Sequence, residues 1–182
     1  ELENKNFKVQ RLKGKQDKSD YEECIKAINQ GYDFIHQGSF NNGEIRGAVD
    51  LLKRVDIPSR LGPFSYIPIE CKLASSINIK FIIQALCYCE LLIESMGNRP
   101  KTFELYLGGG SFEYFDVDKY WAWYQFKKNQ YKSFLRNFNP NEEPEDIPGD
   151  HSNWTEFITE RLKTKRDLIL SLIHISEPTR PL

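Results

Sequence analysis

The chain has 182 residues, of which 40% are hydrophobic and 28% charged, as expected for a soluble globular protein with one ordinary domain. Its formal net charge of -1 excludes a globally basic surface, and it has no apolar run of about 18 residues that would predict a transmembrane helix. The cysteines form no C-x-x-C pair, so we expect buried, reduced thiols in a cytoplasmic protein rather than a metal or cluster site. They are Cys24, Cys71, Cys87 and Cys89.

The first half of the chain has the pattern of short strands with one helix. In chain order we expect an edge strand or frayed start over 1–19, a helix over 20–30, strands over 33–40 and 44–56, a loop over 58–63 and a strand over 64–72. Asp20 is the expected helix cap and Gly31 the expected stop. The Asn-Asn-Gly turn at 41–43 predicts a hairpin, and Pro68 predicts that its strand lies at an edge or carries a bulge.

The second half alternates between helix and strand patterns. We expect a helix over 77–95 closed by Gly97 and Pro100, strands over 102–107 and 112–117 around Gly108-Gly109-Gly110, and an aromatic helix over 117–138. The basic residues of that last helix form either a solvated face or a contact along a DNA backbone. They are Lys119, Lys127, Lys128, Lys132 and Arg136.

The remaining residues divide the chain further. We expect a main domain over 1–138, an acidic, proline-containing linker over 139–152, a terminal helix over 153–170 and a non-native tail over 171–182, which reads like a translated sequencing adapter. The start has neither an initiator Met nor a signal-peptide pattern, so we interpret the chain as a fragment of a longer protein.

Two carboxylates and a lysine at strand positions point to chemistry. Asp50 follows Gly47-Ala48-Val49, and Glu70 and Lys72 end an apolar run. If neighbouring strands bring the carboxylates together, they can hold Mg²⁺ or Mn²⁺, with the backbone carbonyl of Cys71 as a third oxygen ligand. Alternation along the strand places Glu70 and Lys72 on one face, where the lysine can orient water or offset charge on a phosphate, and turns Cys71 into the core.

The following helix adds two polar groups at one-turn spacing. Gln84 and Tyr88 are i and i+4 neighbours on an otherwise apolar helix, so they share one face. Gln84 could bond a site ligand or a phosphate, and Tyr88 could form a hydrogen bond or stack on a base. Several basic residues surround these motifs in sequence, where phosphate contacts would be useful. They are Arg46, Lys53, Arg54, Arg60 and Lys80.

In this order, the motifs Gly47-x-x-Asp50, Glu70-Cys71-Lys72 and Gln84-x-x-x-Tyr88 resemble those of the PD-(D/E)XK nuclease superfamily, and within it the RecB-like nucleases. The resemblance covers roughly residues 20–168. Within the family, the chain is most similar to predicted RecB-family nucleases that are often fused to other nucleic-acid domains. It implies a restriction-endonuclease-like α/β fold, in which helices flank a mixed central sheet. It also implies a Mg²⁺- or Mn²⁺-dependent deoxyribonuclease that acts on single strands or ends, in repair, recombination or mobile-element processing.

The likeness has departures that shape the expected site. The relatives carry an upstream helical acid or histidine that completes the metal site, which we expect before Glu1. His36 is a weak substitute for that ligand, and its neighbour Gln37, on the other side of the strand, is expected to face the site and position substrate. The relatives also often carry cysteines compatible with an iron–sulfur cluster, whereas residues 150–154 have none, so we predict no cluster. The incomplete site leaves an alternative function, a catalytically weak nucleic-acid-binding module of a larger protein.

Overall fold

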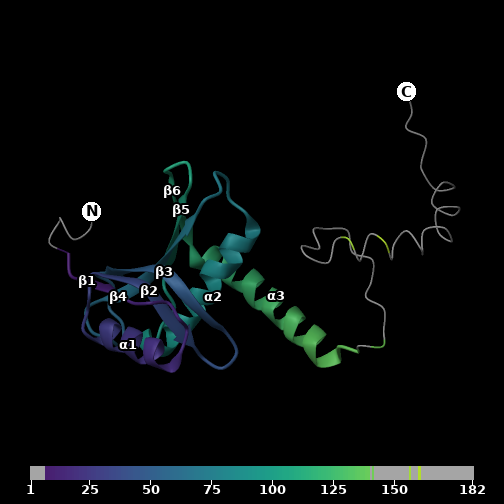
Figure 1. The fold of residues 1–182 in the computed structure, drawn as a ribbon, viewed down its shortest axis with the longest axis horizontal. Helices are drawn as coiled ribbons and strands as arrows, with labels where there is room; N and C mark the ends of the chain where they lie inside the picture. The colour runs from purple at the N-terminus through teal and green to yellow at the C-terminus, as the bar shows by residue number, and fades with distance from the viewer. Residues whose placement is uncertain (1–6, 140, 142–155, 157–159, 161–182) are drawn as a thin grey trace, which may run out of the picture. The chain divides into compact units, whose positions relative to one another are not determined.

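The computed structural model describes residues 7–139, 141, 156 and 160 (Figure 1). The chain divides into two compact units, Glu1–Asn137 and Phe138–Leu182. Within the described residues, no helix is both long and apolar enough to cross a membrane. The predicted linker, terminal helix and tail fall almost wholly outside the described residues, although Glu156 and Glu160 are described and helical.

The first unit is built on one mixed β-sheet. Its elements in the described part are β1 (Val9–Arg11), α1 (Lys18–Asn29), β2 (Phe34–Asn41), β3 (Arg46–Val55), β4 (Ser65–Lys72), α2 (Ile79–Met96), β5 (Thr102–Leu107), β6 (Phe112–Asp116) and α3 (Val117–Asn137). The strands lie side by side in sequence order. The pairs β1–β2 and β4–β5 are parallel, because a helix connects each, and the other pairs are antiparallel. The prediction of an α/β fold with a mixed sheet flanked by helices is therefore confirmed.

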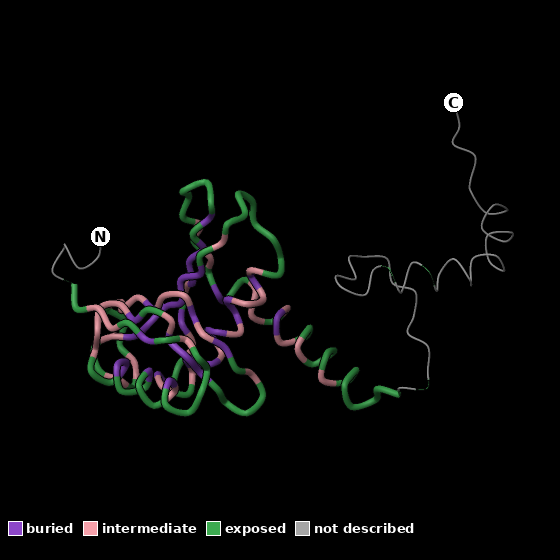
Figure 2. The backbone as a smooth tube through the Cα atoms, viewed as in Figure 1, coloured by how far each residue is buried: buried purple, intermediate pink, exposed green. Residues whose placement is uncertain are grey.

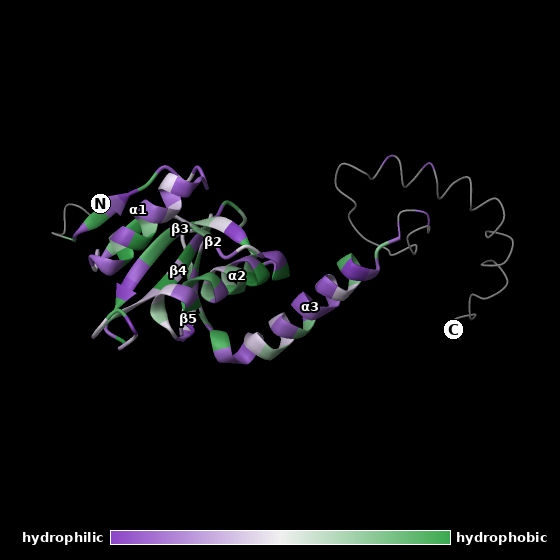
Figure 3. Ribbon diagram, turned by 90° about the horizontal axis from the view of Figure 1, so that it is seen from below, coloured by the Kyte–Doolittle hydropathy of each residue, from purple (hydrophilic) through white to green (hydrophobic). Residues whose placement is uncertain are grey.

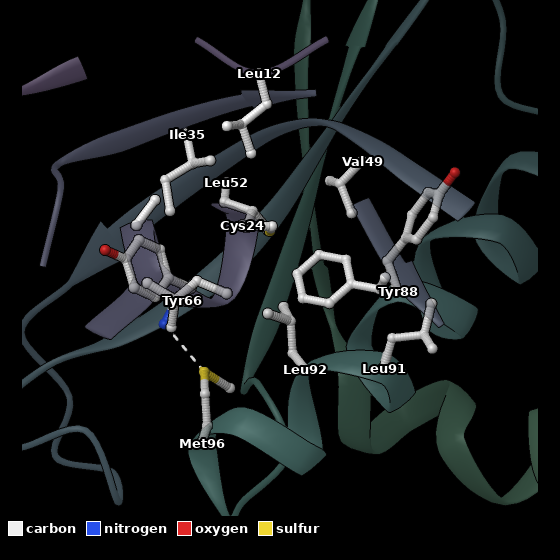
Figure 4. Packing of buried hydrophobic residues seen from close by; sticks show 13 residues of the cluster. Leu12, Cys24, Ile35, Val49, Leu52, Tyr66, Tyr88, Leu91, Leu92 and Met96 are labelled. Carbon is white, nitrogen blue, oxygen red and sulfur yellow. Dashed lines mark hydrogen bonds between the residues drawn. The ribbon is translucent and has the colours of Figure 1, made fainter. Parts of the chain in front are cut away.

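Two buried clusters join the helices to the sheet. The first packs residues of α1 and α2 against β2, β3 and β4, with Tyr66 and Leu92 fully buried at its centre (Figure 4). The second packs α2 and α3 against β5, around Phe103 and Leu105. Helix α2 contributes to both clusters and is largely hydrophobic, whereas α3 carries many hydrophilic residues (Figure 3). The far half of α3 extends from the sheet and is mostly exposed (Figure 2).

The predicted helix ends are partly correct. The cap of α1 is Asp17, whose carboxylate accepts the Asp20 N–H at 2.9 Å, so the prediction of Asp20 as the cap is wrong. Asp20 lies inside the first turn, where its buried carboxylate accepts the backbone N–H of Lys15. Gly97 ends α2 with φ of 75°, a left-handed conformation that glycine adopts without steric cost. Its position as the end of that helix is confirmed.

Pro68 does not mark an edge strand. Strand β4 lies between β3 and β5, and its register with β3 runs without interruption through Pro68, so neither the expected edge position nor the expected bulge is found. Pro68 pairs in register with Leu52 of β3, and the pairing with β5 begins only one residue later, at Ile69. The missing N–H therefore falls before the stretch of β4 that β5 pairs with, which explains how a central strand accommodates it.

Candidate active site

The structure brings the predicted site residues together at the end of β4. Strand β3 supplies Asp50, strand β4 supplies Glu70 and Lys72, and α2 supplies Gln84 and Tyr88. These side chains form one continuous hydrogen-bonded network that also includes backbone groups of both strands. Residues that are separated by as many as 40 positions in sequence, namely Ala48 and Tyr88, therefore meet in one place.

The two carboxylates interlock across the neighbouring strands. The backbone N–H of Asp50 donates to Glu70 Oε1 at 3.2 Å, and the backbone N–H of Cys71 donates to Asp50 Oδ2 at 2.9 Å. Each carboxylate is thus fixed by the strand that carries the other. Since β3 and β4 are paired only up to Leu51 and Ile69, the carboxylates take over where the regular ladder stops.

Lys72 links this pair to the helix. Its ammonium donates to Glu70 Oε2 at 2.7 Å and to Gln84 Oε1 at 2.8 Å. The Gln84 amide then donates to the Tyr88 hydroxyl at 3.1 Å, and that hydroxyl donates to the Ala48 carbonyl at 3.0 Å. Helix α2 is therefore tied through its polar face to both strands of the site.

The Tyr88 side chain lies inside the protein rather than at its surface. Its ring is buried, and burial raises the pKa of its hydroxyl to about 12. The ring lies against Gly47, where an added Cβ would come within 2.8 Å of Cε1. Of the two roles that the sequence left open for Tyr88, the hydrogen bond is observed and stacking on a base is not available to the buried ring.

Burial also sets the charge behaviour of Glu70. This side chain is 1% exposed, and the loss of solvation raises its carboxyl pKa, with the nearby Asp50 charge acting in the same direction. The Lys72 ammonium opposes both effects by stabilising the ionised form. Glu70 is therefore a buried acid whose charge depends on its lysine partner.

The alternation of side chains is interrupted in β2 and β3, and the interruption brings Gln37 and Asp50 into contact. The paired residues Ile35 and Leu52 lie on one side of the interruption and the paired residues Gly38 and Val49 on the other, yet both pairs are on the same buried face of the sheet. Positions three apart on a regular strand point to opposite faces, so the alternation is interrupted between these pairs. Gln37 and Asp50 occupy the interruption, and Gln37 takes a φ of 55°, in the left-handed region. Its amide donates to Asp50 Oδ1 at 3.2 Å, so Gln37 faces the site as expected.

Cys71 lies on the side opposite to the one expected. Its thiol is exposed, so the prediction that Cys71 points into the core is wrong. At this end of β4 the buried face of the strand is the one that carries Glu70, and alternation places Cys71 on the other face. Cys87 is half-buried, and only Cys24 and Cys89 are buried as expected of the free thiols. His36 is exposed on β2.

The residues that could hold a metal ion offer oxygen donors. The carboxylates of Asp50 and Glu70, with the backbone carbonyl of Cys71 between Glu70 and Lys72, are the hard ligands that Mg²⁺ and Mn²⁺ prefer. In the described part of the chain, no group of three or more His, Cys, Asp and Glu side chains is placed to hold an ion. The expected upstream ligand remains a prediction.

Several basic residues near the motifs serve the fold. Lys53 donates to Glu104 at 3.0 Å, and Arg60 donates to the carbonyl of Glu94 at the end of α2. Arg54 lies over the Phe64 ring. Arg46 and Lys80 are exposed, and neither has an ion-pair partner in the described part of the chain. On α3, Lys128 and Lys132 pair with Glu44.

The sequence motifs do not single out Tyr106, an exposed side chain that pairs in register with Cys71 on the adjacent strand β5 and therefore lies on the face of the sheet opposite to Glu70. Strand alternation was available as a clue, because it turns Tyr106 away from the buried Leu105 and Leu107.

No family model matches the sequence, and no curated protein is similar enough to be matched with it.

Proposed function

We propose that this protein is a metal-dependent nuclease that hydrolyses phosphodiester bonds in DNA, with the restriction-endonuclease-like fold and RecB-like site that its motifs resemble. The observation that carries the proposal is the interlocked network of Asp50, Glu70 and Lys72 at the end of paired strands. Two carboxylates and an ammonium at one point can serve both an ion and an anionic substrate. Single strands or ends are the expected substrates on the resemblance alone.

Each residue has a role that follows from its bonds. Asp50, Glu70 and the Cys71 carbonyl would hold Mg²⁺ or Mn²⁺, which neutralises charge on the phosphoryl oxygens and lowers the pKa of water when bound. Lys72 lies against Glu70, where its ammonium can orient the attacking water or stabilise charge on the phosphate. Gln84, Tyr88 and Gln37 are positioning residues.

These positioning residues act through their neighbours. Gln84 holds Lys72, and Gln37 holds Asp50. Tyr88 fixes Gln84 and the backbone of β3 together. A site held from two strands and a helix is preorganised, since its members need little movement to reach their working geometry.

The alternative is a catalytically weak nucleic-acid-binding module, and one observation favours it. Both oxygens of Glu70 already accept hydrogen bonds from the protein, from the Asp50 N–H and from Lys72, and the side chain is buried. An ion would have to compete with Lys72 for one of these oxygens.

The experiment is cleavage of end-labelled single-stranded and duplex DNA by the full chain with Mn²⁺, with Mg²⁺ and with EDTA. We expect cleavage that requires the ion and is lost in Glu70→Gln and in Lys72→Ala. Glu104→Gln is the matched control, because Glu104 is also a buried glutamate bonded to a lysine, but on the opposite face of the sheet.

The outcomes separate the two functions. Loss in the Glu70 variant with retention in the Glu104 variant supports the nuclease. Absence of cleavage by the wild type and by a chain extended upstream of Glu1, with DNA affinity unchanged in Glu70→Gln, would favour the binding module.

A further inference from the structure

Strand β6 forms one edge of the sheet, and in the described part of the chain no strand lies beyond it. The β5–β6 hairpin projects beyond the rest of the sheet, which leaves this edge accessible (Figure 1). Hydrogen bonds at both ends of the hairpin define its pairing. The Leu107 N–H donates to the Ser111 carbonyl at 3.0 Å, and the Val117 N–H donates to the Lys101 carbonyl at 2.9 Å. Residues of β6 that lie an even number of positions from Ser111 and Val117 therefore bond inward, to β5.

The other residues of β6 turn their backbone groups outward. Hydrogen-bonded pairs alternate along an antiparallel ladder with pairs whose N–H and C=O groups point away from the partner strand. The register of β5 with β6 is uninterrupted from Thr102 and Asp116 to Tyr106 and Phe112. The outward positions are therefore Phe112, Tyr114 and Asp116, where another strand can join the sheet.

The two edges of the sheet differ in how they are protected. At the opposite edge, β1 has only 3 residues, includes Arg11 and is flanked by Lys8 and Lys13. Short strands and basic side chains are common means by which proteins prevent edge-to-edge pairing. Strand β6 has no lysine, arginine or proline and no bulge, and two of its outward positions carry exposed aromatic rings, Phe112 at 50% and Tyr114 at 68%. Its edge is therefore suited to pairing.

We propose that β6 pairs with β6 of a second copy of this chain, antiparallel and with Tyr114 on the two-fold axis, so that one sheet continues across a dimer. In this register Tyr114 of each copy exchanges a pair of hydrogen bonds with the other, and Phe112 lies opposite Asp116 of the second copy. The outward positions are symmetric about Tyr114, so the strand matches itself. This interaction is independent of the proposed nuclease function.

Charge and strand length select this register over its neighbours. An axis at Glu113 would place the two Glu113 carboxylates directly opposite each other, and like charges in that position destabilise a sheet. An axis at Phe115 would bring the first turn of α3 opposite Phe112, where the strand has already ended. With the axis at Tyr114, Glu113 lies opposite Phe115 of the second copy, and no two carboxylates of β6 are directly opposed.

The pairing also covers exposed aromatic surface. Phe112 and Tyr114 lie on the face of the sheet that carries Tyr106, whose ring centre lies 4.6 Å from that of Phe112. A two-fold axis perpendicular to the sheet keeps these side chains of both copies on one face, so the two Tyr114 rings become cross-strand neighbours. Cross-strand aromatic pairs stabilise antiparallel sheets.

The test is self-association of the full chain from about 10 µM to about 1 mM, measured by sedimentation equilibrium. A single strand pair is a small interface of the weak, transient class, so we expect a dissociation constant on the order of 100 µM. Mass action then places about four-fifths of the chains in dimers at about 1 mM. In residue-resolved amide exchange by NMR, the Tyr114 N–H should exchange about fourfold more slowly at the higher concentration, whereas the inward N–H groups of Glu113 and Phe115 should be protected at both.

Two variants remove the pairing at the same position. Tyr114→Pro deletes an outward N–H and no bond to β5, a place where an edge strand tolerates proline, and Tyr114→Lys adds the charge that protects many natural edges. Both should be monomeric over the same concentration range. Tyr131→Lys makes the matching change at another exposed tyrosine, on α3, and should dimerise like the wild type. Phe115→Pro deletes an N–H that bonds to β5, so it should lower Tm more than Tyr114→Pro does.

The outcomes decide the proposal. A wild type that stays monomeric at every concentration would overturn it and leave the edge to an extended segment of another protein. A dimer that persists in both Tyr114→Pro and Tyr114→Lys would also overturn it, because association would then use another surface. If Tyr114→Pro does not fold, Tyr114→Lys and the exchange of the Tyr114 N–H in the wild type decide the question.

Discussion

Replacing Lys72 by methionine should destabilise the protein, because it leaves Glu70 buried without its compensating charge. Glu70 is 1% exposed, the Lys72 side chain is 15% exposed, and the two are 2.7 Å apart. Removing one partner of a buried ion pair costs about 3–5 kcal/mol, and the partial exposure of Lys72 places this pair at the lower end, about 3 kcal/mol. For a chain of this length, that corresponds to a fall in Tm of about 6–12 °C.

The loss should depend on pH in a defined direction. Burial raises the pKa of Glu70 in the folded state, so its contribution to stability is greatest below the ordinary pKa of a glutamate and declines as pH rises through the raised value. Without Lys72 the carboxyl pKa rises further, because the ammonium is what lowers it. The deficit of Lys72→Met should therefore be smaller at pH 5 than at pH 8.

Urea denaturation at the two pH values measures both effects. The double variant Glu70→Gln with Lys72→Met should recover most of the lost stability, since the buried charge is then gone. A deficit below about 1 kcal/mol at pH 8, or a double variant no more stable than Lys72→Met, would refute the reasoning that Lys72 compensates a buried charge.

Three further changes probe the residues that position the site. Tyr88→Phe should lower the free energy of unfolding in urea by about 1 kcal/mol, because it removes the hydrogen bond to the Ala48 carbonyl. It should leave the shape of the pH–rate profile for cleavage unchanged up to pH 10, because the pKa of the Tyr88 hydroxyl is about 12, and a changed profile would contradict this. Gly47→Ala should cost about 1–3 kcal/mol and reduce cleavage, because the new methyl collides with the Tyr88 ring, whereas Gly109→Ala should match the wild type in stability. Gln37→Gly should be more stable than Gln37→Val by at least about 1 kcal/mol in thermal denaturation, because glycine adopts the left-handed backbone conformation without strain. Both variants should cleave DNA more slowly than the wild type, since both lose the hydrogen bond to Asp50. Equal stabilities of the two variants would argue against backbone strain at position 37.

The helical part of the site could be predicted from sequence because its geometry is local. Gln84 and Tyr88 are four residues apart on a helix, and that spacing alone makes them neighbours. The observed bond of 3.1 Å between them follows directly. Likewise, Glu70 and Lys72 lie two apart on a strand, which puts both on one side and allows their 2.7 Å contact.

Non-local geometry was harder to predict, and Cys71 shows why. Alternation correctly separated Cys71 from Glu70, but it could not say which side of β4 is buried. A buried carboxylate with an exposed cysteine beside it reverses the usual preference of these side chains. The reversal depends on Lys72 and on the Asp50 N–H, which satisfy the Glu70 oxygens and are known only once β3 and α2 are in place.

Gln37 and Asp50 show the same limit at the level of the backbone. Regular alternation through β2 would turn Gln37 and Gly38 to opposite sides, but it gives no sign that a left-handed residue interrupts the strand. The interruption is what lets Asp50 leave the regular ladder and accept bonds from the Gln37 amide and the Cys71 N–H. A strained glutamine in a strand is destabilising by itself, so it persists only where the surrounding bonds fix it, and here those bonds end on a carboxylate of the candidate site. The backbone irregularity is therefore an independent mark of the place that the three sequence motifs predicted.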